Sequence, residues 1–318
     1  MHGMAQSVCD KIKAKYGVDF PHHEISLDVF KSGEILPRIP ETVRRQHVFL
    51  FFPLQLPDPN FALIACYLTC DALMRAHVGG ITLVIPNAVY MRQDRKNEKR
   101  EPISARAIAD LLTMNPKVEG IIATDLHTQQ AEGFFRCGVD NLTSRQLFAK
   151  HYQELLGPDL SDVVVVAPDF GDAARADAFA KRLGEDVPVT IFRKNRPAAN
   201  QSEVIGYMGV DVRDKRIILY DDMIDSGGTV RGVMEKLVTD LGATEVHVCA
   251  THGIFSDGAE EAFRSLGHPV ACTDSIPRTS EYLEANASWL TVLSFDELLA
   301  SAVYEASLMG GSVSKLSK

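Results

Sequence analysis

The sequence of 318 residues lacks four features that would each indicate a particular class of protein. It has no run of about 18 apolar residues that could span a bilayer, and its N-terminus has no continuous apolar core of a secretion signal. Its six cysteines include no C-x-x-C pair, which argues against a zinc or redox site of that spacing. It has no basic excess either: the formal net charge is −9, whereas nucleic-acid phosphates are bound mainly by clustered Lys and Arg. We therefore expect a cytoplasmic protein with reduced thiols that binds neither membranes nor nucleic acid.

What the sequence does contain is typical of a globular protein with buried cores. Hydrophobic residues make up 46% of it and charged residues 24%, and the length accommodates roughly one to three domains of ordinary size. Cys66 and Cys70 lie four residues apart in an apolar run, so we expect them on one helix face, packed in a core. A metal site there would need more ligands.

The order of apolar and polar segments repeats once along the chain. Residues 47–52 (HVFLFF) predict a strand, followed by a polar loop, an apolar helix over 61–80 and a second strand over 81–87. The same order recurs from residue 216 with strand RIILYD, loop DMIDSGGT, helix VRGVMEKLVTDLGA and strand EVHVCATH. Such units form right-handed crossovers in parallel sheets. The sequence therefore predicts the α/β class, with two similar domains that each hold a parallel sheet flanked by helices.

We place the boundary between the two predicted domains near residue 145. This gives an N-terminal domain over 1–145, a C-terminal domain over 146–306 and a loose tail over 307–318 without a clear apolar period. The N-terminal domain contains a charged insertion at 90–104, YMRQDRKNEKREPIS. Its composition alone is that of a solvated hairpin or loop.

The stretch at 217–229, IILYDDMIDSGGT, is the most informative part of the sequence. Ligands of open parallel sheets bind beyond the carboxyl ends of the strands, where the loop after this strand would lie. A short turn before a predicted helix is expected from Asp225, Ser226, Gly227, Gly228 and Thr229. Two glycines allow successive N–H groups to converge on one anion, to which the helix N-terminus adds its positive end. We expect this turn to bind a monophosphate.

Asp221 and Asp222 precede this turn, at the predicted end of the strand. Two carboxylates beside a phosphate cradle would repel the phosphate unless they hold something else, and sugar hydroxyls or a divalent cation suit them. The acid pair and the turn together indicate a phosphorylated sugar. The alternative interpretation is a strand end followed by a helix N-cap, with Asp and Ser present for capping alone.

The segment resembles the phosphoribosyl pyrophosphate motif shared by type I phosphoribosyltransferases and ribose-phosphate pyrophosphokinases. Two other stretches, YMRQDRK at 90–96 and TDLHTQQAEGFF at 124–135, are similar to signatures of the pyrophosphokinases, and the resemblance runs from FKSGE at 30–34 to GGSVSKL at 310–316. The duplicated domain plan also favours this family, because transferases of the type generally have one such sheet with a small hood. The resemblance implies a type I phosphoribosyltransferase-like fold. It further implies transfer of the β,γ-diphosphoryl group of Mg-ATP to the 1-hydroxyl of ribose 5-phosphate, which gives phosphoribosyl pyrophosphate and AMP.

In the N-terminal domain, the resemblance implies residues that bind ATP. Arg92 and Gln93 fall where the family contacts ATP, and His127 matches a histidine beside the nucleotide and its metal, Mg²⁺. Phe30 and Glu34 match residues that reach the adenine of a neighbouring subunit, so a homo-oligomer is implied.

In the C-terminal domain, the resemblance adds a carboxylate and two cations to the ribose-phosphate residues. Asp169 in VVVVAPDFGDAAR matches a carboxylate near the ribose and the Mg²⁺, and Arg175 is the matching arginine. Lys194 and Arg196 in FRKNRPAAN match the catalytic lysine and arginine of the family's mobile loop, which could close over the β-phosphoryl group as charge develops. Without the match, these residues would be interpreted as an exposed basic loop between two strands.

Two positions differ from the family pattern. Ser32 replaces the Asp of the adenine-binding F-x-D-G-E motif, and Asp172 replaces the second glycine of PD-x-GG-x-x-R. Two other functions stay open: a non-catalytic synthetase-like regulator that keeps the fold, and a type I phosphoribosyltransferase that consumes the product. The complete DDMIDSGGT and Lys194 argue against the regulator, and RQDRK argues against the transferase.

Overall fold

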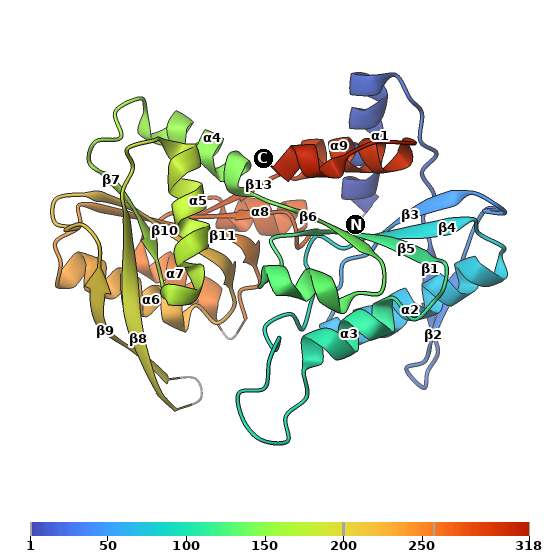
Figure 1. Cartoon of the computed structure of the whole chain (residues 1–318), viewed down its shortest axis with the longest axis horizontal. Helices are drawn as coiled ribbons and strands as arrows, with labels where there is room; N and C mark the ends of the chain where they lie inside the picture. The colour runs from blue at the N-terminus through green and yellow to red at the C-terminus, as the bar shows by residue number, and fades with distance from the viewer. Residues whose placement is uncertain (1, 199–200, 257, 318) are drawn as a thin grey trace. The chain divides into compact units, whose positions relative to one another are not determined.

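The computed structural model of the chain describes residues 2–198, 201–256 and 258–317; the side chains of residues 2, 194–198, 201–205, 229 and 317 lie outside this description. These residues form two compact units (Figure 1). Unit 1 comprises the residues up to Thr143, Ser275–Pro277 and the segment from Phe295 onward. Unit 2 comprises Ser144–Asp274 and Arg278–Ser294.

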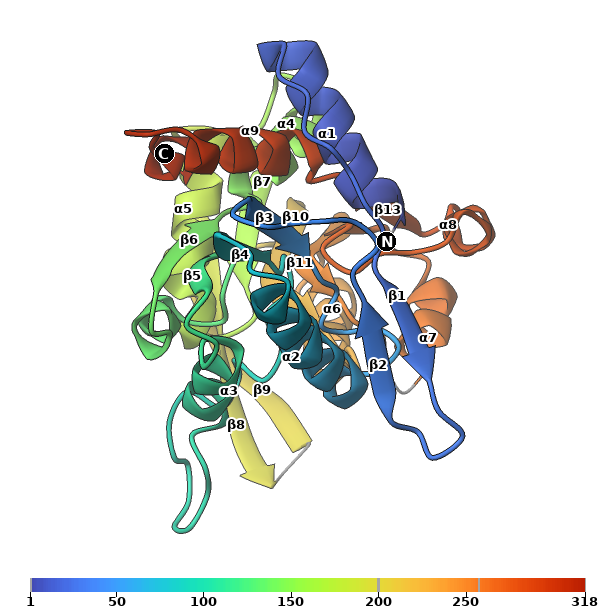
Figure 2. The ribbon, with the colours of Figure 1, turned by 90° about the vertical axis from the view of Figure 1, so that its right-hand side faces the viewer.

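Unit 1 is built on a parallel sheet. Its strands, in spatial order and within the described residues, are β3 (His47–Phe51), β4 (Gly80–Val84), β5 (Val118–Thr124) and β6 (Gly138–Leu142). Figure 1 shows α2 (Pro59–Arg75) and α3 (Ser104–Leu112) on one side of this sheet, and α1 (His2–Tyr16) and α9 (Asp296–Ser307) on the other. The unit also contains an antiparallel hairpin of β1 (Ser26–Val29) and β2 (Ile35–Arg38) (Figure 2). Two short 3-10 turns complete it, η1 (Gln129–Phe134) and η3 (Val313–Ser317).

Unit 2 holds a larger sheet in which only the last strand of the order runs antiparallel. In the described part of the chain, the spatial order is β13 (Leu290–Leu293), β12 (Val270–Thr273), β11 (Glu245–Gly253), β10 (Arg216–Ile224), β7 (Val163–Ala167), β8 (Val189–Ala198) and β9 (Gln201–Met208). The helices are α4 (Arg145–Leu156), α5 (Ala173–Leu183), α6 (Gly228–Thr239), α7 (Ala259–Leu266) and α8 (Ser280–Asn286), with a 3-10 turn η2 (Phe170–Asp172).

The central strands of unit 2 are buried on both faces. Val163 and Val165 of β7 pack into a core with α4 and α5, whereas Val164 and Val166 pack into a second core with α6 and α7. Successive side chains of a strand point to opposite faces, so a strand between two helical layers must be apolar throughout. This confirms the predicted α/β class with parallel sheets flanked by helices.

The helix predicted after β3 begins where local chemistry favours a helix start. Asp58 is the N-cap of α2: its side chain accepts hydrogen bonds from the backbone N–H groups of Asn60 and Phe61, both at 3.0 Å. Cys66 and Cys70 are buried on the inner face of this helix, as expected. All six cysteines lie in described parts of the chain and are free thiols. Of the helices that the structure describes, none combines the length and apolarity needed to cross a bilayer.

The segment from Phe295 onward belongs to unit 1, whereas the predicted domains assigned 146–306 to the C-terminal domain and 307–318 to a tail. The reason is the packing of α9 against α1. The rings of Tyr16 and Tyr304 stack with centroids 3.8 Å apart, and Lys15 Nζ donates a hydrogen bond to Ser301 Oγ at 3.0 Å. Beyond α9, Val313 is buried in η3, so the expected loose tail is instead anchored to the unit.

Candidate functional site

The strand order of unit 2 marks a point where the chain changes direction across the sheet. From β7 the chain continues to β8 on one side, and from β10 it continues to β11 on the other. In open α/β sheets, ligands bind beyond the carboxyl ends of the strands at such a switch point. The loops after β7 and β10 therefore frame the candidate site. Of the predicted ribose-phosphate residues, these loops contain Asp169 and the turn that begins at Asp225.

The turn after β10, Asp225–Thr229, leads directly into α6, and we call it the glycine turn. Gly227 has φ 72°, and a Cβ added there would lie 2.7 Å from the ring of Phe263, so only glycine fits without strain. The turn is fixed by Ser256, whose backbone N–H donates to the Asp225 carbonyl at 3.1 Å and whose hydroxyl donates to the Asp225 carboxylate at 2.5 Å. The first N–H groups of α6 have no partners within the helix and are suited to hold an anion.

Asp221 and Asp222 lie inside β10, whereas the sequence had suggested that they lie at the end of the strand. The strand continues to Ile224 because β11 is equally long and pairs with it up to Gly253. Both carboxylates are buried: Asp221 is 8% exposed and Asp222 only 2%. These two acidic groups therefore lie on the rigid sheet and not on a loop.

A partly buried ion-pair network joins η2 and α5 to β10. Arg175 Nη1 lies 3.2 Å from Asp172 Oδ1 and 3.2 Å from Asp222 Oδ2. Asp172, Asp221 and Asp222 form an acidic cluster in which one carboxylate oxygen of each lies within 4.8 Å of the others. Burial raises the pKa of Asp221 well above its usual value, and the charges of Asp172 and Asp222 raise it further. Oxygen donors of this kind suit Mg²⁺.

Asp169 lies in the loop after β7, at the same end of the sheet as the glycine turn. It caps η2, with its side chain accepting a hydrogen bond from the Gly171 N–H at 2.9 Å. The structure therefore brings Asp169, the acidic cluster and the glycine turn to the carboxyl ends of two adjacent strands, β7 and β10. Sequence reasoning had grouped Asp221 and Asp222 with the glycine turn from the residues alone, and had added Asp169 only through the family match.

The segment with Lys194 and Arg196 is not a loop between strands. Both residues belong to β8, which pairs with β9 as an antiparallel ribbon. The side chains of Lys194 and Arg196, and that of Thr229 in the glycine turn, lie outside the described part of the structure.

The predicted ATP residues Arg92, Gln93 and His127 belong to unit 1. Arg92 and Gln93 are exposed in the insertion, which has neither helix nor strand between β4 and α3. Gln93 is tied to the start of α3, because its side chain accepts a hydrogen bond from Ser104 Oγ and its carbonyl accepts one from the Ala105 N–H at 3.2 Å. His127 is half-buried after β5.

Phe30 and Glu34 form the turn between β1 and β2. The Phe30 N–H donates to the Glu34 carbonyl at 2.8 Å, and Phe30 keeps 53% of its surface exposed. Ser32, which stands where the family has Asp, donates from its hydroxyl to Glu34 Oε2 at 2.7 Å. Sequence reasoning missed this contact and the ion pairs of Arg175. Asp172 and Arg175 have a spacing that permits a pair, but the contact of Arg175 with Asp222 joins segments far apart in the sequence.

Comparison with known proteins gives a consistent result over both units. Residues 1–115 match the N-terminal domain of ribose phosphate pyrophosphokinase, and residues 138–283 match the phosphoribosyl transferase domain. The chain is 41% identical over 244 residues to a ribose-phosphate pyrophosphokinase of Clostridium perfringens, covering 77% of this chain and 75% of that protein. A ribose-phosphate pyrophosphokinase of Vibrio parahaemolyticus is 37% identical over 302 residues, covering 94% of this chain and 91% of the relative. The crystal structure of phosphoribosylpyrophosphate synthetase from Mycobacterium smegmatis matches with a TM-score of 0.78 and 35% identity, over 95% of this chain and 96% of that chain.

We predict opposite effects of alanine at two glycines close in sequence. Gly227→Ala should lower the free energy of unfolding of unit 2 by about 1 kcal/mol or more, because the left-handed φ and the Phe263 ring oppose a Cβ. Gly232→Ala, where a Cβ meets open space within α6, should raise it by about 0.5–1 kcal/mol. The fluorescence of Trp289, the single tryptophan, reports unfolding in urea because its ring stacks on Phe263. Equal shifts for both variants would contradict this account of the turn.

We also predict that Asp172→Asn lowers the pKa of Asp221. The substitution removes a neighbouring negative charge while the burial of Asp221 is retained, so the pKa should fall but stay above its usual value. Carboxyl-carbon NMR titration measures it directly. Asp177→Asn is the matched control, because Asp177 lies in α5, directly after the turn that contains Asp172, but pairs with exposed Lys181 at 2.7 Å. An unchanged pKa of Asp221 in Asp172→Asn would refute the electrostatic role of Asp172.

Proposed function

The chain belongs to the ribose-phosphate pyrophosphokinase family, and we propose that it transfers the β,γ-diphosphoryl group of ATP to the 1-hydroxyl of ribose 5-phosphate. The products are phosphoribosyl pyrophosphate and AMP. The proposal is supported by relatives of that name aligned over 94% of the chain. The structural observation that supports it most strongly is the acidic cluster beside the glycine turn at the switch point of unit 2.

We assign ribose 5-phosphate to this part of unit 2 on chemical grounds. The N–H groups of Asp225, Ser226, Gly227, Gly228 and Thr229 would hold the 5-phosphate, which an α6 N-terminus favours. Asp221 and Asp222 would accept hydrogen bonds from the ribose hydroxyls. The raised pKa of Asp221 reduces the negative charge that the approaching phosphate meets. The proposed pocket therefore combines an anion cradle with acceptors for a neutral diol.

The proposed reaction is an in-line displacement at the β-phosphorus. The oxygen of the ribose 1-hydroxyl forms a bond to the β-phosphorus, the bond from this phosphorus to the α,β-bridging oxygen breaks, and AMP leaves with that oxygen. The hydroxyl proton is released to solvent. Lys194 and Arg196 of β8 are proposed to stabilise the charge that develops on the transferred group, and positioning of the substrates supplies the rest of the rate.

ATP is proposed to bind to residues of unit 1. Arg92 offers a planar guanidinium for bidentate phosphate contact, and Gln93 is already positioned by its hydrogen bonds to the start of α3. Phe30 and Glu34 are proposed to contact the adenine bound by a neighbouring subunit, which makes a homo-oligomer the proposed assembly. The exposure of Phe30 at the tip of the β1–β2 hairpin supports this role.

Mg²⁺ is the proposed cofactor, with His127 and Asp169 as its proposed protein ligands. When bound with ATP, it neutralises the charge of the triphosphate. The residues present fit the ion, because Asp172 of η2 and Asp221 and Asp222 of β10 supply several carboxylate oxygens. A cytoplasmic location is also proposed, since the reaction consumes ATP and the thiols are free.

One assay tests the proposed function. The protein is incubated with ATP, ribose 5-phosphate and Mg²⁺, and we expect AMP and phosphoribosyl pyrophosphate in equal amounts, with no turnover after chelation of Mg²⁺. Turnover only with added base and phosphoribosyl pyrophosphate would indicate a phosphoribosyltransferase. Absence of both reactions would indicate a non-catalytic regulator.

Lys194→Ala should reduce kcat by at least about 100-fold and weaken ATP binding far less, because a group that acts on developing charge contributes mainly in the transition state. Steady-state kinetics together with ATP titration by calorimetry separates the two effects. Arg193→Ala is the matched control: it removes a positive charge from the adjacent position of β8, to which no role in the reaction is assigned, and should keep most of the activity. Equal losses of turnover and ATP affinity in Lys194→Ala would exclude the transition-state role.

A further inference from the structure

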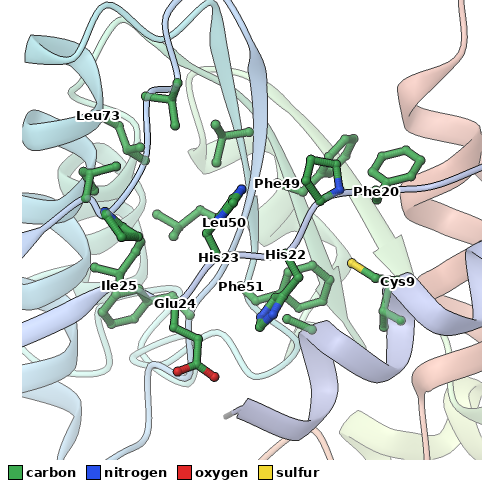
Figure 3. Close-up of a pocket in the computed structure, with 18 of the residues that line it drawn as sticks. Cys9, Phe20, His22, His23, Glu24, Ile25, Phe49, Leu50, Phe51 and Leu73 are labelled. Carbon is green, nitrogen blue, oxygen red and sulfur yellow. The ribbon is translucent and has the colours of Figure 1, made fainter.

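Unit 1 contains a cavity of 450 Å³ that the proposed reaction does not use (Figure 3). β3 forms one wall. α1 and the segment from Phe20 to Ile25 form another, and Cys9 of α1 also lines the cavity. In Figure 3, Cys9 and Phe20 lie on the side of α1, whereas Leu50 and Phe51 belong to the sheet. The size is typical of a ligand pocket.

The cavity follows the edge of β3 and not one of its faces. Every residue from Gln46 to Pro53 lines it, although successive side chains of a strand point to opposite faces of the sheet. A cavity above one face would be lined by alternate residues only. β3 is also the outermost strand of its sheet, and no strand in the described residues pairs with its other edge.

The hydrogen-bond pattern shows which backbone groups face this edge. The Phe52 N–H donates to the Val84 carbonyl at 3.0 Å, and the Gln46 carbonyl accepts from the Gly79 N–H at 2.8 Å, so the even-numbered residues direct their backbone groups toward β4. In a pair of parallel strands, the residues between these direct their backbone N–H and C=O groups away from the partner strand. The N–H and C=O groups of Phe49 and Phe51 therefore point to the outer edge of β3, where the cavity lies.

The lining restricts the chemistry of what could enter. Val8 and Ile12 of α1 are fully buried, and together with the apolar residues of β3 they make the cavity mainly hydrophobic. Of the described residues around it, two are acidic, Glu24 and Glu41, and no lysine or arginine is among them; three histidines also line it, namely His22, His23 and His47. A neutral or basic occupant is favoured over an acidic one.

We propose that this cavity binds an extended polypeptide segment, apolar at alternate positions and without acidic residues, which joins the sheet as a strand beside β3. An extended backbone matches the outward N–H and C=O groups of Phe49 and Phe51, and its alternate side chains would fill the apolar space. A small apolar molecule would bury those backbone groups without partners, which is unfavourable. An open hydrophobic edge is also a template for strand addition unless it is covered.

The test uses synthetic peptides and the thiol of Cys9 as a reporter. The probe is Lys-Val-Thr-Ile-Ser-Val-Lys with blocked ends, and two further versions have N-methyl groups on the backbone amides of one edge or of the other. Alkylation of Cys9 is followed by peptide mapping. Cys137 is the internal control, because it lies outside the cavity and is half-buried like Cys9, and burial raises the pKa of both thiols.

We expect the unmodified peptide at saturation to slow the alkylation of Cys9 by at least about tenfold, with Cys137 unchanged. An added strand uses the N–H groups of only one of its edges to pair with β3. The peptide that is N-methylated on that edge should therefore fail to protect Cys9, and the peptide that is N-methylated on the other edge should still protect it. Protection by all three peptides alike would overturn the proposal in favour of nonspecific apolar binding. Protection by none would overturn it as well.

A pair of protein variants tests the same edge from the other side. Phe49→Pro removes a backbone N–H that faces the cavity and leaves the ladder to β4 intact, so it should weaken protection of Cys9 by the unmodified peptide at least about fivefold relative to Phe49→Leu. Equal protection in both variants would contradict strand pairing. Should Phe49→Pro not fold, the N-methylated peptides on the unaltered chain decide the question. The synthetase assay is independent of this result, since none of the residues assigned to the reaction lines the cavity.

Discussion

The candidate site depends on the burial of two adjacent carboxylates, Asp221 and Asp222, inside a rigid strand. Burial of charge is costly unless a partner offsets it, and here Arg175 lies at 3.2 Å from Asp222 while Asp221 has a raised pKa. The arginine comes from α5, so the strand, the helix and the loop after β7 must all be in place for the acids to be tolerated. This one requirement explains why the glycine turn, the ion-pair network and the switch point of the sheet occur together.

The two positions at which the chain departs from its family are explained by short contacts. Ser32 donates a hydrogen bond to Glu34 and so keeps that carboxylate oriented within the β1–β2 turn. Asp172 shares Arg175 with Asp222 and adds to the negative potential at Asp221. In both cases the substituted residue contacts a neighbour that the family motif also uses. Ser32 and Asp172 therefore each contact a charged residue of their own sequence motif.

The fold class was predictable from the sequence because it depends on the apolar pattern within single segments. VVVVA could only be a strand between two helical layers, and the order of strand, loop and helix fixed the parallel sheets. The glycine turn was also predictable, since Gly227 needs a left-handed φ next to a helix start. The ion pairs of Arg175, the continuation of β10 to Ile224 and the return of α9 to unit 1 were not, because each depends on contacts between segments far apart in the chain. The predicted roles of Lys194 and Arg196 stay predictions.

The packing of α9 on α1 has a consequence for biosynthesis. Unit 2 is nearly continuous in sequence and is interrupted only at Ser275–Pro277, whereas unit 1 needs both the first and the last helices of the chain. A ribosome therefore exposes all of unit 2 before it releases α9. We infer that the nascent chain can complete unit 2 while α9 is still missing from unit 1, so the uncovered sheet of unit 1 is the surface that a chaperone would have to shield until α9 has been synthesised.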